Sequence, residues 1–121
     1  MLVTVFRRRL KEGATFADFI KAWEADKGFG VPARVFNSVS LEDPREILSI
    51  GFVDIDVARL AEMFPGVAAQ EAVRHNRIAD VIESTELRAF YELRTEHDFS
   101  ANPRQIDPSS AESLLASLRG A

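Results

Sequence analysis

The chain has 121 residues, of which 46% are apolar, and its 15 basic and 19 acidic side chains give a formal net charge of −4. This length fits one domain with its own hydrophobic core, and the mild acidity argues against a general nucleic-acid binder, which needs a basic surface to bind phosphates. The sequence contains no cysteine, so disulfides, thiol nucleophiles and cysteine-ligated metal sites are excluded.

The amino-terminal residues do not follow the order of a signal peptide. Residues 1–6 are mostly apolar, but Arg7, Arg8 and Arg9 come after them, whereas a signal peptide carries its positive charge before a longer apolar stretch. No window approaches the roughly 20 apolar residues of a membrane-spanning helix. We therefore expect a soluble, cytoplasmic protein without a membrane partner.

The first two predicted elements are a strand and a helix. Residues 2–9 predict a strand because β-branched and aromatic side chains are frequent among them. Thr15 is placed to cap a helix over residues 16–26, in which apolar residues recur at helical spacing. Those apolar residues are Phe16, Phe19, Ile20 and Trp23.

A hairpin follows. Residues 34–41 and 46–54 predict two strands, and the short polar turn between them contains Pro44. Gly51, inside the second of these strands, indicates a bulge or the close approach of another group.

The second half of the chain predicts helices and then a strand. Asp56 can cap a helical region that Pro65-Gly66 interrupts, which predicts a short helix to residue 64 and a longer one over residues 67–83. Residues 86–96 alternate with period two and predict a fourth strand. One face of it carries Leu87, Ala89, Tyr91 and Leu93, and the other carries Arg88, Phe90, Glu92 and Arg94.

The order β-α-β-β-α-β predicts the α+β, ferredoxin-like arrangement, in which two helices cover one face of an antiparallel sheet. Large apolar side chains nevertheless occur on both faces of the strands, as with Val3 and Val5 on one face and Phe6 on the other. A solvated face would alternate apolar with polar residues. We therefore expect a second copy of the chain to bury the second face, which predicts a homodimer.

We assign residues 1–99 to this domain and residues 100–121 to a connector and a C-terminal helix. Ser109 and Glu112 have the spacing of a capping box at the start of that helix. A helix this short is marginal alone, so we expect it to dock on the dimer.

The pattern resembles the dimeric α/β-barrel superfamily and, within it, the antibiotic-biosynthesis-monooxygenase-like proteins. The resemblance covers residues 2–98 and rests on the element order, on the two-part helix around Phe64-Pro65-Gly66, and on the segment Arg74-His75-Asn76-Arg77-Ile78. It implies that two sheets form a barrel, with a pocket between each sheet and its helices. Members of the family include cofactor-free oxygenases of aromatic polyketides and haem-degrading enzymes.

The haem-degrading branch resembles this chain least. That branch relies on an Asn in the first strand, a Trp in the third strand and a His in the second helix. Here the first strand has no Asn and the third offers Phe52 in place of a Trp, so that only His75 has a counterpart. We therefore do not expect this chain to share the haem chemistry of that branch.

His75 is the candidate catalytic residue. It falls on or beside a stripe of the second helix that we expect to be buried, formed by Phe64, Ala68, Ala72, His75, Ala79 and Ile82. An imidazole in such a place can act as an acid or a base near neutral pH. The alternative is a structural histidine that is bonded to a backbone or carboxylate partner.

Five further residues are candidates for substrate binding. Trp23, Phe52 and Tyr91 could form aromatic walls, whereas Asn37 and Ser49 could orient an oxygenated ligand from the floor of a pocket. The alternatives are core packing for the aromatic residues and a solvent-facing position for Asn37 and Ser49. Arg7 and Arg9 could clamp a carboxylate, or else form surface or inter-chain ion pairs.

Motifs for cofactors are absent. No glycine-rich nucleotide motif occurs, and with only two histidines no three-histidine metal site can form within one chain. We expect neither a cofactor nor a metal.

Two functions follow from these patterns. The first is the binding of a small apolar or aromatic molecule, with possible turnover as a cofactor-independent monooxygenase of an aromatic or polyketide-like substrate, in which His75 is the base. The second is a non-catalytic dimeric module that binds a ligand or a partner protein and whose core is filled, since the chain contains nine phenylalanines.

Overall fold

The computed structural model describes residues 1–23 and 28–106. The end of the predicted first helix, after Trp23, lies outside these residues. So does the predicted C-terminal helix with Ser109 and Glu112.

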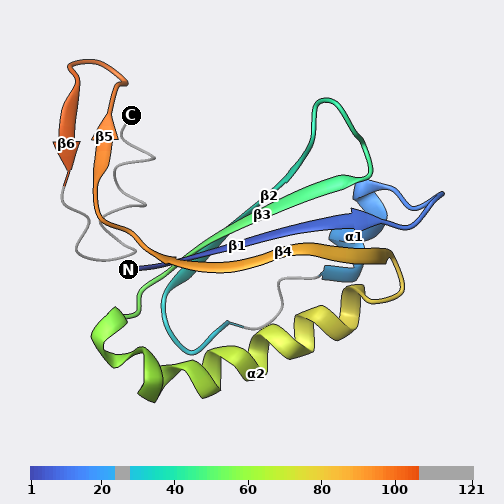
Figure 1. The fold of residues 1–121 in the computed structure, drawn as a ribbon, viewed down its shortest axis with the longest axis horizontal. Helices are drawn as coiled ribbons and strands as arrows, with labels where there is room; N and C mark the ends of the chain where they lie inside the picture. Colours follow the sequence, from blue (N-terminus) through green and yellow to red (C-terminus); the bar gives the residue numbers. More distant parts are fainter. Residues whose placement is uncertain (24–27, 107–121) are drawn as a thin grey trace.

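A four-stranded antiparallel sheet forms the centre of the described chain. Its strands are β1 (Leu2–Leu10), β2 (Ala33–Val39), β3 (Glu46–Val53) and β4 (Ile82–Glu92), in the order β2-β3-β1-β4. The helices are α1 (Phe16–Trp23) and α2 (Leu60–Ile78), and a short 3₁₀ turn, η1 (Val57–Arg59), precedes α2. The prediction of an α+β fold with one antiparallel sheet and two helices is confirmed, and the arrangement is compatible with a ferredoxin-like fold (Figure 1).

The helix starts are capped as the sequence predicts. At α1 the Thr15 hydroxyl accepts a hydrogen bond from the Asp18 N–H, and an Asp18 carboxylate oxygen accepts one from the Thr15 N–H. At η1 the Asp56 carboxylate accepts a bond from the Ala58 N–H. These bonds satisfy backbone donors that have no partner within their own helix.

The predicted break in α2 at Pro65 is wrong, because the helix runs without interruption from Leu60 to Ile78. Pro65 lies in its second turn and removes one backbone donor, yet burial of Val67 and Ile78 keeps the helix on the sheet along its length. The helix also ends earlier than predicted, and β4 begins at Ile82 rather than near residue 86. The pairing of Ile82 with Leu10 explains this, since both side chains are buried in one cluster.

Two short strands follow the sheet and were not predicted. β5 (Glu96–Asp98) and β6 (Arg104–Ile106) pair with each other as an antiparallel ladder. Asp98 accepts a bond from the Ser100 N–H at the turn, and Arg104 pairs with Asp98 across the ladder. The ladder stands away from the main sheet, on the side opposite α2 (Figure 1).

The core between the sheet and the helices consists of two separate clusters. One contains Leu10, Phe19, Ile47, Ile78 and Ile82, and the other contains Leu2, Val53, Ile55 and Val67. β1, β3 and α2 each contribute an apolar residue to both clusters and carry polar residues in between. On β1 and β3 these are Thr4, Arg8 and Ser49, and on α2 they are Glu71 and Arg74. The candidate site lies in this interruption of the core.

Gly51 shows why a glycine occupies the middle of β3. It pairs with Thr4 in the β1–β3 ladder, and a Cβ at Gly51 would overlap the Thr4 hydroxyl oxygen. The predicted close approach is therefore confirmed, and it brings Thr4 into the interruption of the core.

Candidate functional site

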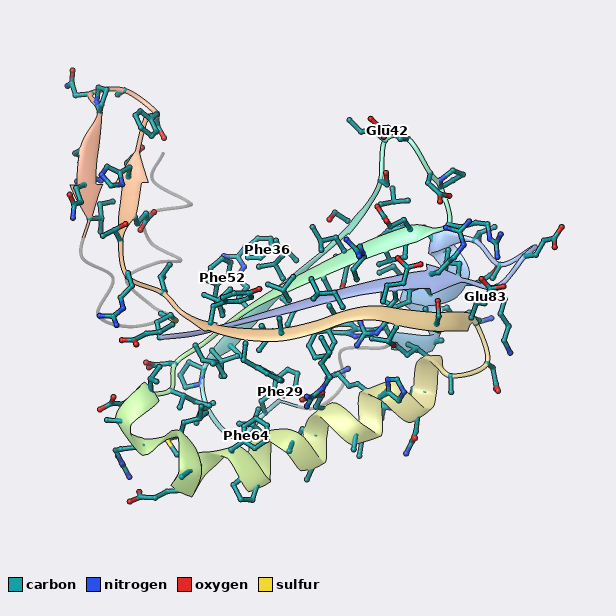
Figure 2. All side chains as sticks on the ribbon, in the orientation of Figure 1. Phe29, Phe36, Glu42, Phe52, Phe64 and Glu83 are labelled. Atoms are coloured by element: carbon teal, nitrogen blue, oxygen red, sulfur yellow. The ribbon has the colours of Figure 1, made fainter. Side chains whose placement is uncertain are left out.

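A cavity of about 60 Å³ lies between the two clusters of the core. Its walls are largely aromatic and aliphatic, and its polar groups come from the interruption described above. The lining residues are Thr4, Phe6, Arg8, Trp23, Phe29, Val35, Ser49, Val53, Val67, Glu71, Arg74 and Phe90. Phe29 and Phe64 point into the space between the sheet and α2, whereas Phe36 and Phe52 lie on the other side of the sheet (Figure 2). We call the cavity of about 60 Å³ the inner cavity.

Arg74 joins the two helices at one wall of the inner cavity. Its side chain is buried, and Nη1 donates a hydrogen bond of 2.9 Å to the carbonyl oxygen of Trp23 at the end of α1. The guanidinium also lies over the indole of Trp23, 4.6 Å from the ring centroid, and 5.4 Å from that of Phe29. A hydrogen bond from a charged donor and a position over an aromatic face are both favourable for a cation, so Arg74 holds Trp23 in place as a wall.

Arg8 lies at the opposite wall, on the helix-covered face of β1. It is 5% exposed, and its guanidinium lies 4.5 Å from the centroid of the Phe6 ring. Within the described part of the chain, Nε of Arg8 has no hydrogen-bond partner. Burial lowers the pKa of Arg8 from its ordinary value to about 10, and the negative charge of Glu71 partly opposes this. Arg8 is therefore a desolvated cation at neutral pH.

Glu71 is the carboxylate whose negative charge acts on Arg8, but its oxygens are bound by Arg88 of β4. Nε of Arg88 lies 2.8 Å from one Glu71 oxygen, and Nη2 lies 3.3 Å from the other. Such a two-bond pair occupies both oxygens of the carboxylate. Positive charge therefore exceeds negative charge around Arg8, Glu71 and Arg88.

A second, open groove of about 330 Å³ lies between α2 and β4. It shares Phe6 and Glu71 with the inner cavity, and its other lining residues are Ala68, Ala72, His75, Asn76, Thr85 and Arg88. We call it the outer groove. Phe6 and Glu71 thus line both hollows.

The expected burial of His75 is wrong. The buried positions of α2 are Val67, Arg74 and Ile78, and His75 is exposed. The helix is therefore rotated so that the position before His75 faces the sheet. His75 lines the outer groove, not the inner cavity.

Asn37 and Ser49 lie beside each other across the β2–β3 ladder. The Ser49 hydroxyl donates a 2.7 Å hydrogen bond to the Asn37 side-chain oxygen, and Ser49 is buried and lines the inner cavity. The structure thus brings Trp23 and Ser49 to one cavity, with Asn37 behind Ser49. These positions are compatible with a polar floor beneath a flat ligand.

Phe52 and Tyr91 lie elsewhere. Both occupy the face of the sheet that the helices leave uncovered, where Val3 pairs with Phe52 on one side and with Tyr91 on the other. Phe52 contacts Phe36 edge-to-face, with ring centroids 5.9 Å apart, and Tyr91 is 54% exposed. The structure does not bring either residue together with Trp23.

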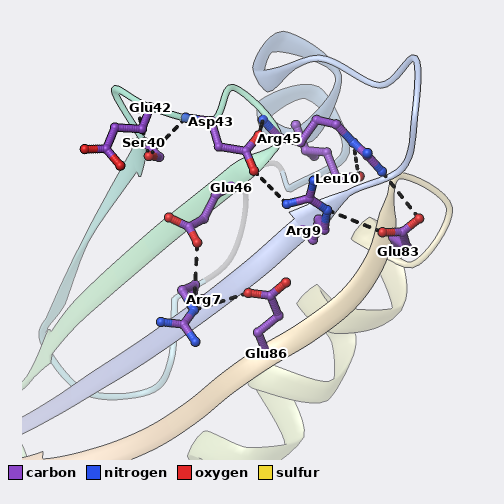
Figure 3. A network of polar contacts seen from close by, with 10 residues as sticks. All are labelled: Arg7, Arg9, Leu10, Ser40, Glu42, Asp43, Arg45, Glu46, Glu83 and Glu86. Carbon is purple, nitrogen blue, oxygen red and sulfur yellow. Dashed lines mark hydrogen bonds and ion pairs between the residues drawn. The ribbon is translucent and has the colours of Figure 1, made fainter.

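Arg7 and Arg9 also lie on the uncovered face, where each has acidic partners (Figure 3). Arg7 pairs with Glu86 at 3.3 Å, and Arg9 pairs with Asp43 at 2.7 Å and with Glu83 at 3.6 Å. The β1–β4 register shifts twice, skipping residues 86 and 83. Both glutamates are therefore extra residues of β-bulges, which bring them to these arginines.

Sequence reasoning did not select Arg8, Glu71 and Arg74 as site residues. A signal for Arg8 exists, since it shares the period-two face of β1 with Leu2, Phe6 and Leu10. A charged residue at such a position is buried whenever helices cover that face.

Comparisons with known proteins give no further assignment: no family model, curated protein or solved structure matches the chain. The resemblance to the monooxygenase-like proteins therefore stays a prediction. Among residues 1–23 and 28–106, no helix is long and apolar enough to cross a membrane, and no three metal-ligating side chains cluster.

The Asp43 carboxylate should make the stability of the fold depend on pH. Its bonds from the Arg45 N–H and from the Arg9 guanidinium lower its pKa below the ordinary 3.8. A lowered pKa stabilises the fold above pH 4, and this contribution is lost as the pH falls through the folded-state pKa. Asp43→Asn should therefore be less stable than the wild type at pH 7 and equally stable near pH 2. Urea unfolding of both proteins between these pH values measures the difference in their free energies of unfolding.

Glu42→Gln is the matched control, because it removes a charge from the same turn and the Glu42 side chain points away from the arginines (Figure 3). A stability difference for Asp43→Asn that persists unchanged at pH 2 would contradict the electrostatic explanation.

Proposed function

We propose that this protein binds a small aromatic or apolar molecule between its sheet and α2. The observation that carries the proposal is the interrupted core, because residues at the centre of a domain of this size ordinarily pack into one continuous cluster. Here aromatic rings and buried polar groups surround a cavity instead. Apolar walls with a few convergent polar groups are typical of small-molecule sites.

The sizes of the two hollows suggest how such a ligand would lie. The inner cavity, at about 60 Å³, is smaller than the roughly 300 Å³ at which ligand pockets begin. The outer groove, at about 330 Å³, reaches that size and shares the lining residues Phe6 and Glu71 with the inner cavity. In the proposal one end of the ligand enters the inner cavity and its body occupies the groove.

The uncovered face of the sheet supports the proposed homodimer and, with it, the barrel of two facing sheets. Two adjacent cross-strand rows on this face are almost wholly apolar: Phe36, Ile50, Val5 and Ala89, and then Phe52, Val3 and Tyr91 beside Arg34. Contiguous apolar surface of this kind marks interaction sites. The ion pairs of Arg7 and Arg9 bound it at one end, and their charges are already matched within the chain. A second copy would bury apolar rows without leaving these charges unpaired.

Cofactor-independent oxidation of a phenolic or polyketide-like substrate is a second candidate function. The position of His75 in the outer groove favours it, since an imidazole that reaches the ligand can remove its proton. Oxygen would then oxidise the resulting anion. Exposure of the imidazole is unfavourable to this candidate, because water competes at an open site.

Ligand binding can be measured through Trp23, the one tryptophan of the chain, which lines the inner cavity. Phenol or hydroquinone should change its fluorescence in a saturable way. Val35→Phe should weaken binding at least 10-fold, because the larger side chain fills the cavity that Val35 lines. Val39→Phe, on the same face of β2 but outside the cavity, should bind as the wild type does. No saturable binding of either probe by the wild type would contradict the proposal.

Dimerisation predicts a mass in solution of twice that of the chain at micromolar concentration. Phe36→Asp should weaken the dimer by about 30-fold or more, since it places a charge in an apolar row. Leu41→Asp is the control, because Leu41 is fully exposed in the β2–β3 turn. A monomeric wild type in analytical ultracentrifugation would contradict the proposed dimer. A dimer that survives Phe36→Asp but is lost on truncation after residue 106 would contradict its assignment to the uncovered face of the sheet.

The oxidation candidate has its own test. His75→Ala should lower oxygen consumption with hydroquinone by about 100-fold or more, the usual loss when a general base is removed. His97→Ala, which changes the other histidine, should have no effect, since His97 stacks on Phe99 beyond the sheet. Equal rates for wild type and His75→Ala would exclude this role while leaving ligand binding untouched.

A further inference from the structure

Arg8 is the one described side chain at the inner cavity that has both a buried charge and a nitrogen without a partner. It is 5% exposed, and Nε has no acceptor within the described residues. A buried cation is costly unless an anion or several hydrogen bonds compensate it. The ring of Phe6, at 4.5 Å, provides part of that compensation but accepts no ordinary hydrogen bond from Nε.

The neighbouring charged groups do not fully compensate the positive charge of Arg8. Both oxygens of Glu71 bond to Arg88, so that one carboxylate serves two guanidiniums. An anion that entered the inner cavity would therefore meet excess positive charge.

We propose that the ligand is a monocarboxylate, and that Arg8 binds its carboxylate from inside the inner cavity. The inference rests on the proposed function, which it narrows to a ligand class. The Nε–H and one Nη–H of a guanidinium form a planar fork that matches the two oxygens of a carboxylate. The Ser49 hydroxyl in the same cavity already donates its hydrogen to Asn37, so Arg8 is the donor for the carboxylate, and the aromatic walls would hold a flat apolar body.

The size of the inner cavity agrees with this ligand class. A water-sized probe needs about 10–15 Å³, so a cavity of about 60 Å³ holds a carboxylate and one or two carbons rather than a whole aromatic acid. The ring of a benzoate or phenylacetate would lie beyond Phe6 and Glu71 in the outer groove.

The test compares benzoate with benzamide, which has nearly the same shape and no charge. Wild-type protein should bind benzoate about 10- to 100-fold more tightly, the range for hydrogen bonds between charged groups. Arg8→Met should remove this preference, so that benzoate binds no more tightly than benzamide, and Arg8→Lys should retain part of it, because it keeps the charge without the fork. Arg7→Met, on the opposite face of the same strand, should preserve the preference.

A measurement on the wild type alone covers the case in which Arg8 variants fail to fold. Benzoate should shift the Arg8 Nε–H resonance in a nitrogen-15 NMR spectrum, whereas benzamide should not. Equal affinity for benzoate and benzamide, or a benzoate preference that survives Arg8→Met, would overturn the inference.

The failure of the inference and that of the proposed function are distinguishable. If phenol binds and Val35→Phe weakens it, but benzoate has no advantage, only the carboxylate assignment falls. If neither phenol nor benzoate binds the wild type, both fall together.

Discussion

Buried arginines in the middle of the core are the constraint on which the rest of this structure depends. Arg8 on β1 and Arg74 on α2 are 5% and 8% exposed, and they lie where apolar residues would otherwise join the two core clusters. Guanidinium groups cannot pack as aliphatic side chains do, because their charge needs partners. The clusters therefore remain separate, and aromatic rings close around the charges. Removal of these charges would let the core close, at the expense of the cavity.

The sequence of β1 predicts which residues share a face of the strand, but not which face the helices cover. The period of two correctly places Arg8 on the face opposite Arg7 and Arg9, and it places Phe6 and Leu10 beside Arg8. Both faces of the strand are apolar, however, so the pattern does not indicate which of them the helices cover. That choice depends on tertiary packing, and it decides that Arg8 is buried while Arg7 and Arg9 form surface ion pairs.

The rotation of α2 was less predictable than its existence. The alanines of this helix, such as Ala68 and Ala72, fit a buried or an exposed stripe equally well, so the apolar pattern fixes the rotation weakly. A shift of one residue turns a helix by about 100°, which is enough to exchange Arg74 for His75 at the sheet. The β5–β6 ladder was missed for another reason: its strands have three residues each and carry charged side chains, too short a pattern for periodicity to detect.

The two sides of the inner cavity differ in how firmly they are held, and this difference indicates where a ligand would enter. On the Trp23 side, Arg74 combines a backbone hydrogen bond with contacts to two aromatic rings, and it is buried. On the side of the outer groove, the barrier is the pair between Glu71 and Arg88, whose arginine side chain is 48% exposed. Water reaches this pair on its arginine side, so that separating it costs less than moving a desolvated cation away from two aromatic rings. Once the ligand carboxylate has passed Glu71 and paired with Arg8, Glu71 would again pair with Arg88, so that each of the two guanidiniums would have an anionic partner.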